Sequence, residues 1–149
     1  VMKHILFEET SSNLRLVTDT TYVPKILSLG FGSGALTQVL LDSIPGALVR
    51  AVDIEDNLPG LSARYFGYKL HAKNLHFEVG DCTDVVQQHL TARDFYDVVV
   101  VDCFSADATV PETCRSETFV GSLAKLVKPR AGLVVSHIWD NTQNKTDEG

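Results

Sequence analysis

Short apolar runs alternate with longer stretches of mixed polarity along most of the chain. Five runs predict β-strands, and they cover Lys25–Leu29, Leu48–Ile54, Leu75–Val79, Tyr96–Asp102 and Gly132–His137. The run Tyr96–Asp102 is continuously apolar at its centre, without the alternation of a half-buried strand. Strands take this form in a parallel sheet, because helices cover both of its faces. The pattern therefore predicts a parallel sheet.

The stretches between the apolar runs predict helices, because their apolar residues recur three or four positions apart. These stretches are Ala35–Ser43, Leu58–Leu70, Thr83–Leu90 and Ser116–Val127. Pro59 stands near the first turn of the second stretch, where its missing N–H removes no hydrogen bond. Strands and helices that alternate in this way, joined by right-handed crossovers, predict an α/β fold with a doubly wound, Rossmann-like parallel sheet.

Two short segments precede this alternation, His4–Phe7 and Leu14–Val17, and the turn-forming residues between them predict a β-hairpin. We therefore divide the chain into an N-terminal hairpin segment, residues 1–22, and a Rossmann-like domain, residues 23–149. The sequence begins without an initiator methionine and finishes in a polar stretch. We accordingly expect it to be part of a longer protein.

The composition is that of an ordinary globular domain, with 44% hydrophobic and 21% charged residues among 149. A chain of this length suits one hydrophobic core. The formal net charge of −6 disfavours a nucleic-acid partner, because such binders usually carry a basic face. No apolar run approaches the roughly 20 residues that cross a bilayer, so we expect a soluble protein without a membrane partner.

Cysteine and histidine usage bears on redox and metal chemistry. The three cysteines, Cys82, Cys103 and Cys114, are an odd number and include no C-x-x-C pair. They suit neither a disulfide framework nor a zinc site, so we expect reduced thiols and a cytoplasmic protein. The histidines do not cluster at metal-ligand spacings, and we predict no metal site; they are His4, His71, His76, His89 and His137.

A glycine-rich turn separates the first strand of the predicted sheet from the first predicted helix. Gly30, Gly32 and Gly34 form the pattern G-x-G-x-G. Without Cβ atoms these positions allow positive φ angles and the close approach of a ligand, and the following helix offers free N–H groups. The dinucleotide form G-x-G-x-x-G would place its third glycine at Ala35, a residue that this form also tolerates. The turn predicts either a nucleotide-like ligand site or a tight turn that binds nothing.

An acidic residue ends the second strand of the predicted sheet. Asp53 follows Gly34 by 19 residues, close to the roughly 20 expected for an acidic residue that meets a ribose. A carboxylate accepts two hydrogen bonds at once, so it can hold both ribose hydroxyls. Glu55, two residues later, is the alternative for this role, although it also suits a solvated position or a helix N-cap. We predict that Asp53 binds the ribose.

The next two strands also end on candidate functional groups. After the third strand, Asp81 either accepts a hydrogen bond from an adenine amino group or caps the next helix, and Cys82 offers its backbone to the ring. Asp102 ends the fourth strand, and Asp107 lies in the loop that follows. A carboxylate there can accept a proton from an amine or hold its ammonium form. Asp102 and Asp107 are therefore the candidate catalytic residues, with a solvated loop position as the alternative for Asp107.

Several motifs together resemble the spermidine synthase-like branch of the class I methyltransferase superfamily, over roughly Lys25 to Asn141. The motifs are Leu29–Gly34, Ala51–Glu55, Tyr65–Gly67, Gly80–Asp81, Tyr96–Asp102, Val110–Pro111, Glu117–Phe119 and Leu126–Leu133. The resemblance implies that Gly30, Asp53 and Asp81 line a site for S-adenosylmethionine or its decarboxylated form, to which we add Gly32, Gly34 and Cys82.

The same resemblance bears on the ends of the chain. It implies that the N-terminal hairpin is a remnant of the small β domain of that family. A complete sheet of the class I methyltransferase type carries two more strands after the fifth. These strands either lie in another part of a longer protein, or the sheet is completed in another way.

One departure from the resemblance bears on the reaction. Aminopropyltransferases carry a catalytic aspartate three residues after the aspartate that ends the fourth strand, and here this position holds Ser105. Serine is a poor proton acceptor at neutral pH. The resemblance therefore favours a methyltransferase that acts on an amine or protein acceptor. The alternatives are a polyamine aminopropyltransferase such as spermidine synthase, an inactive nucleotide-binding domain and, least favoured, a dinucleotide-dependent oxidoreductase. A homodimer is the candidate assembly.

Overall fold

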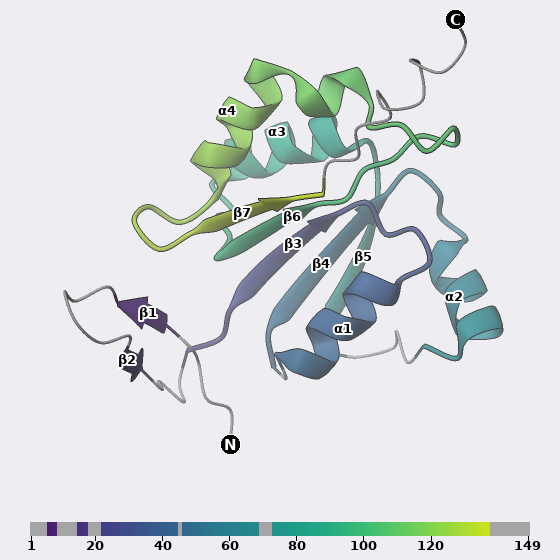
Figure 1. The fold of residues 1–149 in the computed structure, drawn as a ribbon, viewed down its shortest axis with the longest axis horizontal. Helices are drawn as coiled ribbons and strands as arrows, with labels where there is room; N and C mark the ends of the chain where they lie inside the picture. Colours follow the sequence, from purple (N-terminus) through teal and green to yellow (C-terminus); the bar gives the residue numbers. More distant parts are fainter. Residues whose placement is uncertain (1–5, 9–14, 18–21, 45, 69–72, 138–149) are drawn as a thin grey trace, which may run out of the picture.

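A computed structural model describes residues 6–8, 15–17, 22–44, 46–68 and 73–137. Its main feature is a five-stranded sheet in the order β5-β4-β3-β6-β7, in which every neighbouring pair is parallel (Figure 1). The strands are β3 (Lys25–Leu29), β4 (Leu48–Asp53), β5 (Leu75–Val79), β6 (Val98–Val101) and β7 (Leu133–Ser136). The predicted parallel sheet is confirmed, with its five strands at the expected places.

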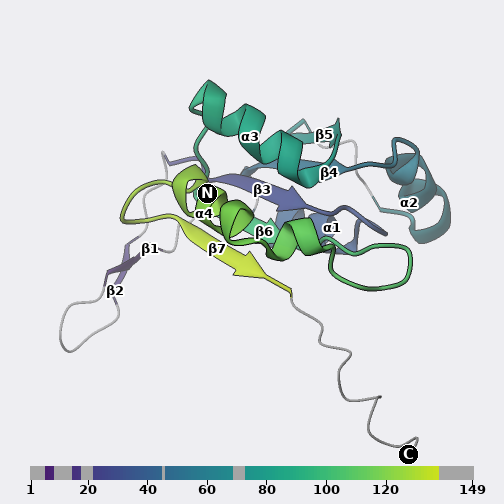
Figure 2. The same ribbon diagram turned by 90° about the horizontal axis from the view of Figure 1, so that it is seen from above.

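Helices cover both faces of this sheet. They are α1 (Ala35–Ser43), α2 (Leu58–Phe66), α3 (Cys82–Ala92) and α4 (Glu117–Leu126), together with the short 3₁₀ helix η1 (Glu112–Arg115). Figure 1 shows α3 and α4 on one face and α1 on the other. Figure 2 looks onto the face that α3 and α4 cover, with the strands following one another from β5 to β7. The predicted doubly wound arrangement is confirmed.

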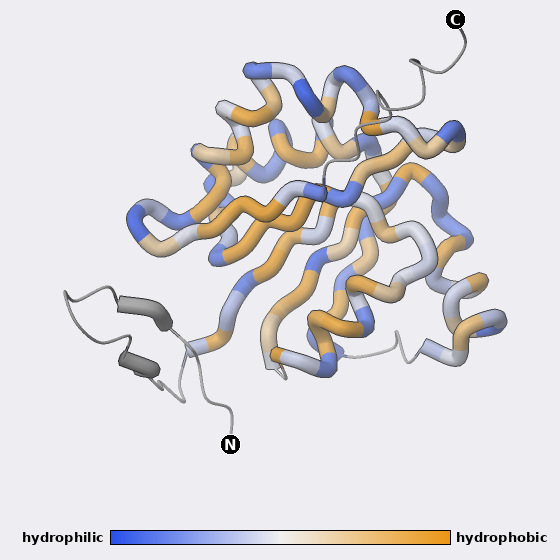
Figure 3. Tube along the Cα trace, in the orientation of Figure 1, coloured by the Kyte–Doolittle hydropathy of each residue, from blue (hydrophilic) through white to orange (hydrophobic). Residues whose placement is uncertain are grey.

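The hydrophobic core has two parts, one on each face of the sheet. Leu27 and Leu29 of β3 point into the larger part, with Val85 of α3 and Leu123 of α4. Ile26 points into the smaller part, and residues of α1 and β4 pack around it. This alternation along β3 explains why its sequence is apolar at nearly every position. Figure 3 shows the same pattern, with hydrophobic residues along the central strands.

Five helix boundaries differ from the prediction: besides the end of α2 and the start of α3, α3 ends two residues later, at Ala92, and α4 (Glu117–Leu126) is one residue shorter at each end. The structure ends α2 at Phe66 rather than Leu70, because Gly67 takes the left-handed conformation with φ 69° that terminates helices. The structure also starts α3 at Cys82, one residue earlier than predicted, because the Asp81 side chain accepts a hydrogen bond from the Thr83 backbone N–H and caps the helix. The predicted end of α2 at Leu70 is therefore wrong, and residues 69–72 lie outside the described part of the chain.

The N-terminal hairpin is present, with bounds that differ from the predicted ones. Strand β1 (Leu6–Glu8) pairs antiparallel with β2 (Arg15–Val17), and Leu6 lies opposite Val17. The predicted strands began at His4 and Leu14, outside the described residues. Among the helices of the described residues, none is long and apolar enough to cross a membrane.

Candidate functional site

The centre of the sheet contains the point at which the strand order reverses. Strand β3 pairs with β4 on one side and with β6 on the other, so the connections after β3 and β5 leave in opposite directions. In doubly wound sheets the ligand crevice lies at this point, outside the carboxyl ends of the strands. Gly30 follows the carboxyl end of β3, and Asp102 follows that of β6. Both predicted site residues therefore border the expected crevice.

The glycine loop has the backbone geometry that the sequence predicted. Gly30, Gly32 and Gly34 have φ angles of 88°, 52° and 81°, all in the left-handed region. A Cβ at Gly30 would lie 2.1 Å from the carbonyl oxygen of Asp102, so this position also requires glycine for space. A Cβ at Gly32 would meet nothing within 4 Å, so the loop is open on that side.

The last glycine of the loop determines how α1 begins. Gly34 is the N-cap residue, and without a side chain it makes no capping hydrogen bond. The first N–H groups of a helix attract polar or anionic ligand groups, especially where no side chain caps them. The loop and the start of α1 thus form a polar cradle at the strand ends.

Asp53 organises the glycine loop. Its Oδ2 accepts hydrogen bonds from the backbone N–H groups of Phe31 at 2.9 Å and Gly32 at 3.2 Å. Its Oδ1 accepts a longer bond, 3.3 Å, from the N–H of Glu55. Sequence reasoning took Asp53 only as a ligand for ribose and missed this bracing role, because the contact joins residues 21 and 22 positions apart. The ribose role of Asp53 stays a prediction.

A second contact braces the loop from α2. The Ser62 hydroxyl donates a 2.6 Å hydrogen bond to the carbonyl oxygen of Ser33, and Ser62 is buried. The sequence offered one signal, a serine among the apolar positions of an amphipathic helix. The loop is therefore held by the end of β4 on one side and by α2 on the other.

Asp81 has the structural role that we considered as its alternative. Its Oδ1 accepts hydrogen bonds from the backbone N–H and the hydroxyl of Thr83, which together with the helix start make it the N-cap of α3. The Thr83 hydroxyl is the main cause of a lowered pKa for Asp81, which keeps the side chain charged. Both bonds use Oδ1, and the contact of Asp81 with adenine stays a prediction.

Cys82 and Cys103 lie together near the carboxyl ends of the sheet strands. Their Sγ atoms are 2.9 Å apart, and both cysteines are free. The neighbouring Cys82 thiol and burial raise the pKa of the Cys103 thiol, so it stays protonated. This pair packs the start of α3 against the segment that follows β6, and the predicted reduced state fits its environment.

The two candidate catalytic aspartates occupy different surroundings. The Oδ1 of Asp102 lies 2.8 Å from Nδ1 of His137, the residue that follows β7. Asp107 is exposed, and its Oδ1 accepts hydrogen bonds from the hydroxyl of Thr109 at 2.8 Å and its N–H at 3.2 Å. The Thr109 hydroxyl lowers the pKa of Asp107. Asp107 thus closes a turn in its own loop, while Asp102 is joined to the neighbouring strand. A catalytic role stays a prediction for both.

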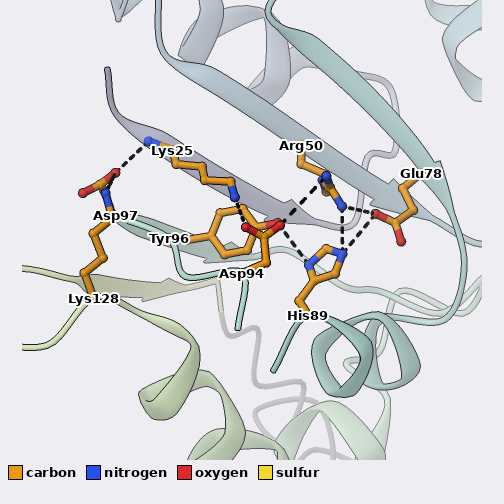
Figure 4. Close-up of polar contacts among 8 residues, drawn as sticks. All are labelled: Lys25, Arg50, Glu78, His89, Asp94, Tyr96, Asp97 and Lys128. Carbon is orange, nitrogen blue, oxygen red and sulfur yellow. Dashed lines mark hydrogen bonds and ion pairs between the residues drawn. The ribbon is translucent and has the colours of Figure 1, made fainter. Parts of the chain in front are cut away.

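A second polar cluster lies away from the glycine loop, between β4, β5 and α3 (Figure 4). Arg50 donates to Nε2 of His89 at 2.9 Å and to Glu78 at 3.1 Å, and Tyr96 joins the other ring nitrogen of His89 at 3.0 Å. Burial is the main cause that lowers the pKa of His89, against the opposing effect of Glu78, so the ring is neutral. Because its members satisfy one another, we interpret this cluster as structural.

Within the described ranges, no group of three or more histidine, cysteine or acidic residues is arranged to hold a metal ion. A cavity of about 620 Å³ lies beside the crevice rather than in it, between α3 and the segment containing η1. It is lined by Thr83, Asp84, Gln87, Glu112, Thr113, Ser116, Thr118 and Phe119. The chemistry-bearing residues at the strand ends therefore define the candidate site better than cavity size does.

Comparison with known proteins places this geometry in context. No protein-family model matches the sequence. The eEF1A lysine and N-terminal methyltransferase of Bos taurus is 27% identical over 100 residues, which are 66% of this chain and 14% of the relative. The chain thus spans about one seventh of the length of the curated relatives it matches.

Solved structures share the fold. Human methyltransferase-like protein 13, in complex with SAH, superposes with a TM-score of 0.67 at 19% identity, covering 76% of this chain and 53% of that one. A probable spermidine synthase from Corynebacterium glutamicum gives a TM-score of 0.62 at 23% identity, covering 76% and 39%. The chain therefore has the class I methyltransferase fold, as the sequence predicted.

Proposed function

We propose that this chain is the cofactor-binding domain of an S-adenosylmethionine-dependent methyltransferase that acts on an amine of a protein. The observation that carries the proposal is the glycine loop at the reversal point of the sheet, braced by Asp53 and open above Gly32. Human methyltransferase-like protein 13, which shares the fold, is in complex with SAH, the product left when S-adenosylmethionine gives up its methyl group. This likeness supports the same cofactor here.

The residues present suit that cofactor. A Cβ at Gly32 would stand in open space above the loop, so a ligand has room to approach the backbone there. Asp53 is the residue to hold the ribose, Asp81 and the Cys82 backbone are the groups to meet adenine, and the start of α1 offers N–H groups. The cofactor supplies a methyl group on a positively charged sulfur, so the protein mainly has to align the acceptor with it.

An amine acceptor is supported from two directions. The curated relatives are lysine and N-terminal methyltransferases of eEF1A, and both of those acceptors are amines. Ser105, which is exposed, stands where an aminopropyltransferase would carry its catalytic aspartate. Putrescine is largely protonated at neutral pH, so aminopropyl transfer needs a carboxylate there. Methyl transfer is therefore favoured over polyamine synthesis.

The test compares the two cofactors and the two reactions. Calorimetry should show that the protein binds S-adenosylmethionine more tightly than the decarboxylated form, and Gly32→Val should abolish binding while the domain still folds. Incubation with S-adenosylmethionine and eEF1A should give methylated lysine or N-terminal amine by mass spectrometry. Incubation with putrescine and the decarboxylated form should give no spermidine. Spermidine at an ordinary enzymatic rate of about 1 per second would refute the methyltransferase proposal.

A further inference from the structure

Asp102 and His137 form a side-chain pair that the proposed function does not yet use. Strands β6 and β7 are neighbours, and the backbone N–H of His137 donates to the carbonyl oxygen of Val101 at 2.9 Å. This pairing brings the two side chains together, with Nδ1 of His137 2.8 Å from Oδ1 of Asp102. The Phe104 ring contacts the imidazole edge-on, with centroids 5.1 Å apart. Backbone, carboxylate and aromatic ring together fix the orientation of His137.

The hydrogen bond determines which ring nitrogen carries the proton. An ionised carboxylate only accepts hydrogen bonds, so Nδ1 of His137 is the donor and the neutral ring has its lone pair on Nε2. The His137 side chain is 60% exposed, so a molecule from outside can reach this ring. A basic nitrogen with a carboxylate behind it is the arrangement in which histidine serves as a general base.

Asp102 and His137 lie on the side of the crevice away from the glycine loop. The glycine loop and Asp53 follow β3 and β4, whereas Asp102 and His137 follow β6 and β7, across the reversal point of the sheet. Gly30 nevertheless touches the backbone of Asp102, so the two sides meet without a gap. A nucleotide held by the glycine loop and Asp53 would leave the ends of β6 and β7 open to the acceptor.

We infer that His137 is the general base for the acceptor amine and that Asp102 is its positioning residue; this inference rests on the proposed methyltransferase function. Nε2 of His137 takes one proton from the acceptor ammonium and leaves a neutral amine. The amine lone pair forms the nitrogen–carbon bond while the carbon–sulfur bond breaks, and that bonding pair stays on sulfur. Asp102 stabilises the resulting imidazolium, which returns its proton to water.

Single-turnover kinetics with S-adenosylmethionine and eEF1A test the role of His137. His137→Gln should slow methyl transfer at pH 7 by about a hundredfold or more, since general bases contribute factors of this order. It should leave cofactor affinity within about twofold, because His137 lies outside the nucleotide side of the crevice. Added imidazole should restore part of the rate of His137→Gly.

Two further variants distinguish the role of His137 from a general effect of substitution. His76→Gln changes an exposed histidine in β5, at a cavity on the opposite ends of the strands, and should behave as the parent. Asp102→Asn should slow transfer and also change the tautomer of His137. A rate for His137→Gln within threefold of the parent, together with a slow Asp102→Asn, would overturn the inference and make Asp102 the base itself.

Nitrogen NMR of labelled histidine tests the pair without any acceptor. The spectrum should show His137 protonated at Nδ1 and unprotonated at Nε2, and Asp102→Asn should remove this preference. The opposite tautomer in the parent would refute the inference. Failure of the parent to methylate any amine would instead refute the proposed function, so the two failures are distinguishable.

Discussion

The α-carbon of Gly30 lies against the carbonyl group of Asp102, so closely that a Cβ at Gly30 would be 2.1 Å from the carbonyl oxygen. This contact joins the glycine loop to the end of β6, where the candidate catalytic residues begin. Gly32, two positions along, has a positive φ but open space around it. Gly30 therefore requires glycine both for space and for its φ angle, whereas Gly32 requires it for its φ angle alone.

Substitution by alanine should distinguish these two requirements by the change in the free energy of unfolding. Gly30→Ala should lower the free energy of unfolding by about 3 kcal/mol or more, from backbone strain and the clash with Asp102. Gly32→Ala should cost only about 1 kcal/mol, the left-handed penalty alone. Gly121→Ala on α4, where a Cβ meets nothing within 4 Å, is the control and should stabilise the protein by about 1 kcal/mol. Urea denaturation measures all three, and equal losses at Gly30 and Gly32 would contradict the assignment.

Asp53→Asn should weaken S-adenosylmethionine binding. The variant keeps the shape of the side chain but loses the charge that strengthens its hydrogen bonds to the loop and to a ribose. The loss should be about 1.5 to 3 kcal/mol, or roughly ten- to a hundredfold in the dissociation constant. Asp56→Asn, at an exposed position nearby, is the control. If Glu55→Gln weakens binding instead and Asp53→Asn does not, the ribose role belongs to Glu55.

The neutral state of His89 should make stability depend on pH. Burial lowers the pKa of His89 below its usual value of 6.5, so in the range just below 6.5 the unfolded chain binds a proton that the folded protein does not. The free energy of unfolding should therefore fall as the pH drops below about 6.5, by at most about 1.4 kcal/mol per pH unit for one group. The decrease should stop once the pH passes the lower, folded pKa.

Urea denaturation between pH 7 and 5 measures this slope. His89→Gln should flatten it, whereas His76→Gln, at an exposed position, should leave it unchanged. The same slope in the parent and in His89→Gln would show that another group is responsible.

The thiols near the strand ends should resist alkylation in the folded protein. Cys103 is buried and its pKa is raised, and burial also raises the pKa of Cys114. Since the thiolate is the reactive form, iodoacetamide at pH 7.5 should modify both at least about tenfold more slowly in buffer than in urea. Mass spectrometry of peptides resolves the sites. Rapid modification of Cys103 in buffer would mean that this edge of the sheet opens.

Elements with a local signal were predictable from the sequence. Helix α1 starts and ends where expected, because Gly30, Gly32 and Gly34 precede it and Pro45 and Gly46 follow it. Helix α2 ends earlier than predicted, because Gly67 terminates it as a left-handed C-cap, and a glycine at this position is itself a local signal. Local signals thus locate helix ends in this chain, provided that a glycine inside a helical pattern is weighed as a C-cap.

The contacts within the site were not predictable in the same way. Asp102 and His137 are 35 residues apart, and only the pairing of β6 with β7 makes them neighbours. Cys82 and Cys103 likewise meet only because β5 and β6 end at the same edge. A sequence pattern can place a carboxylate at a strand end, but the partner of that carboxylate depends on strand order and register.

The bracing of the glycine loop has a kinetic consequence. Asp53 and Ser62 hold the loop through hydrogen bonds within the protein itself, so these contacts order its backbone independently of the cofactor. Binding then needs no slow rearrangement of the loop, and the entropy lost on binding comes mainly from the ligand. Association should proceed at a rate set by simple encounter, and substitutions around the loop should change how long the cofactor stays rather than how fast it enters.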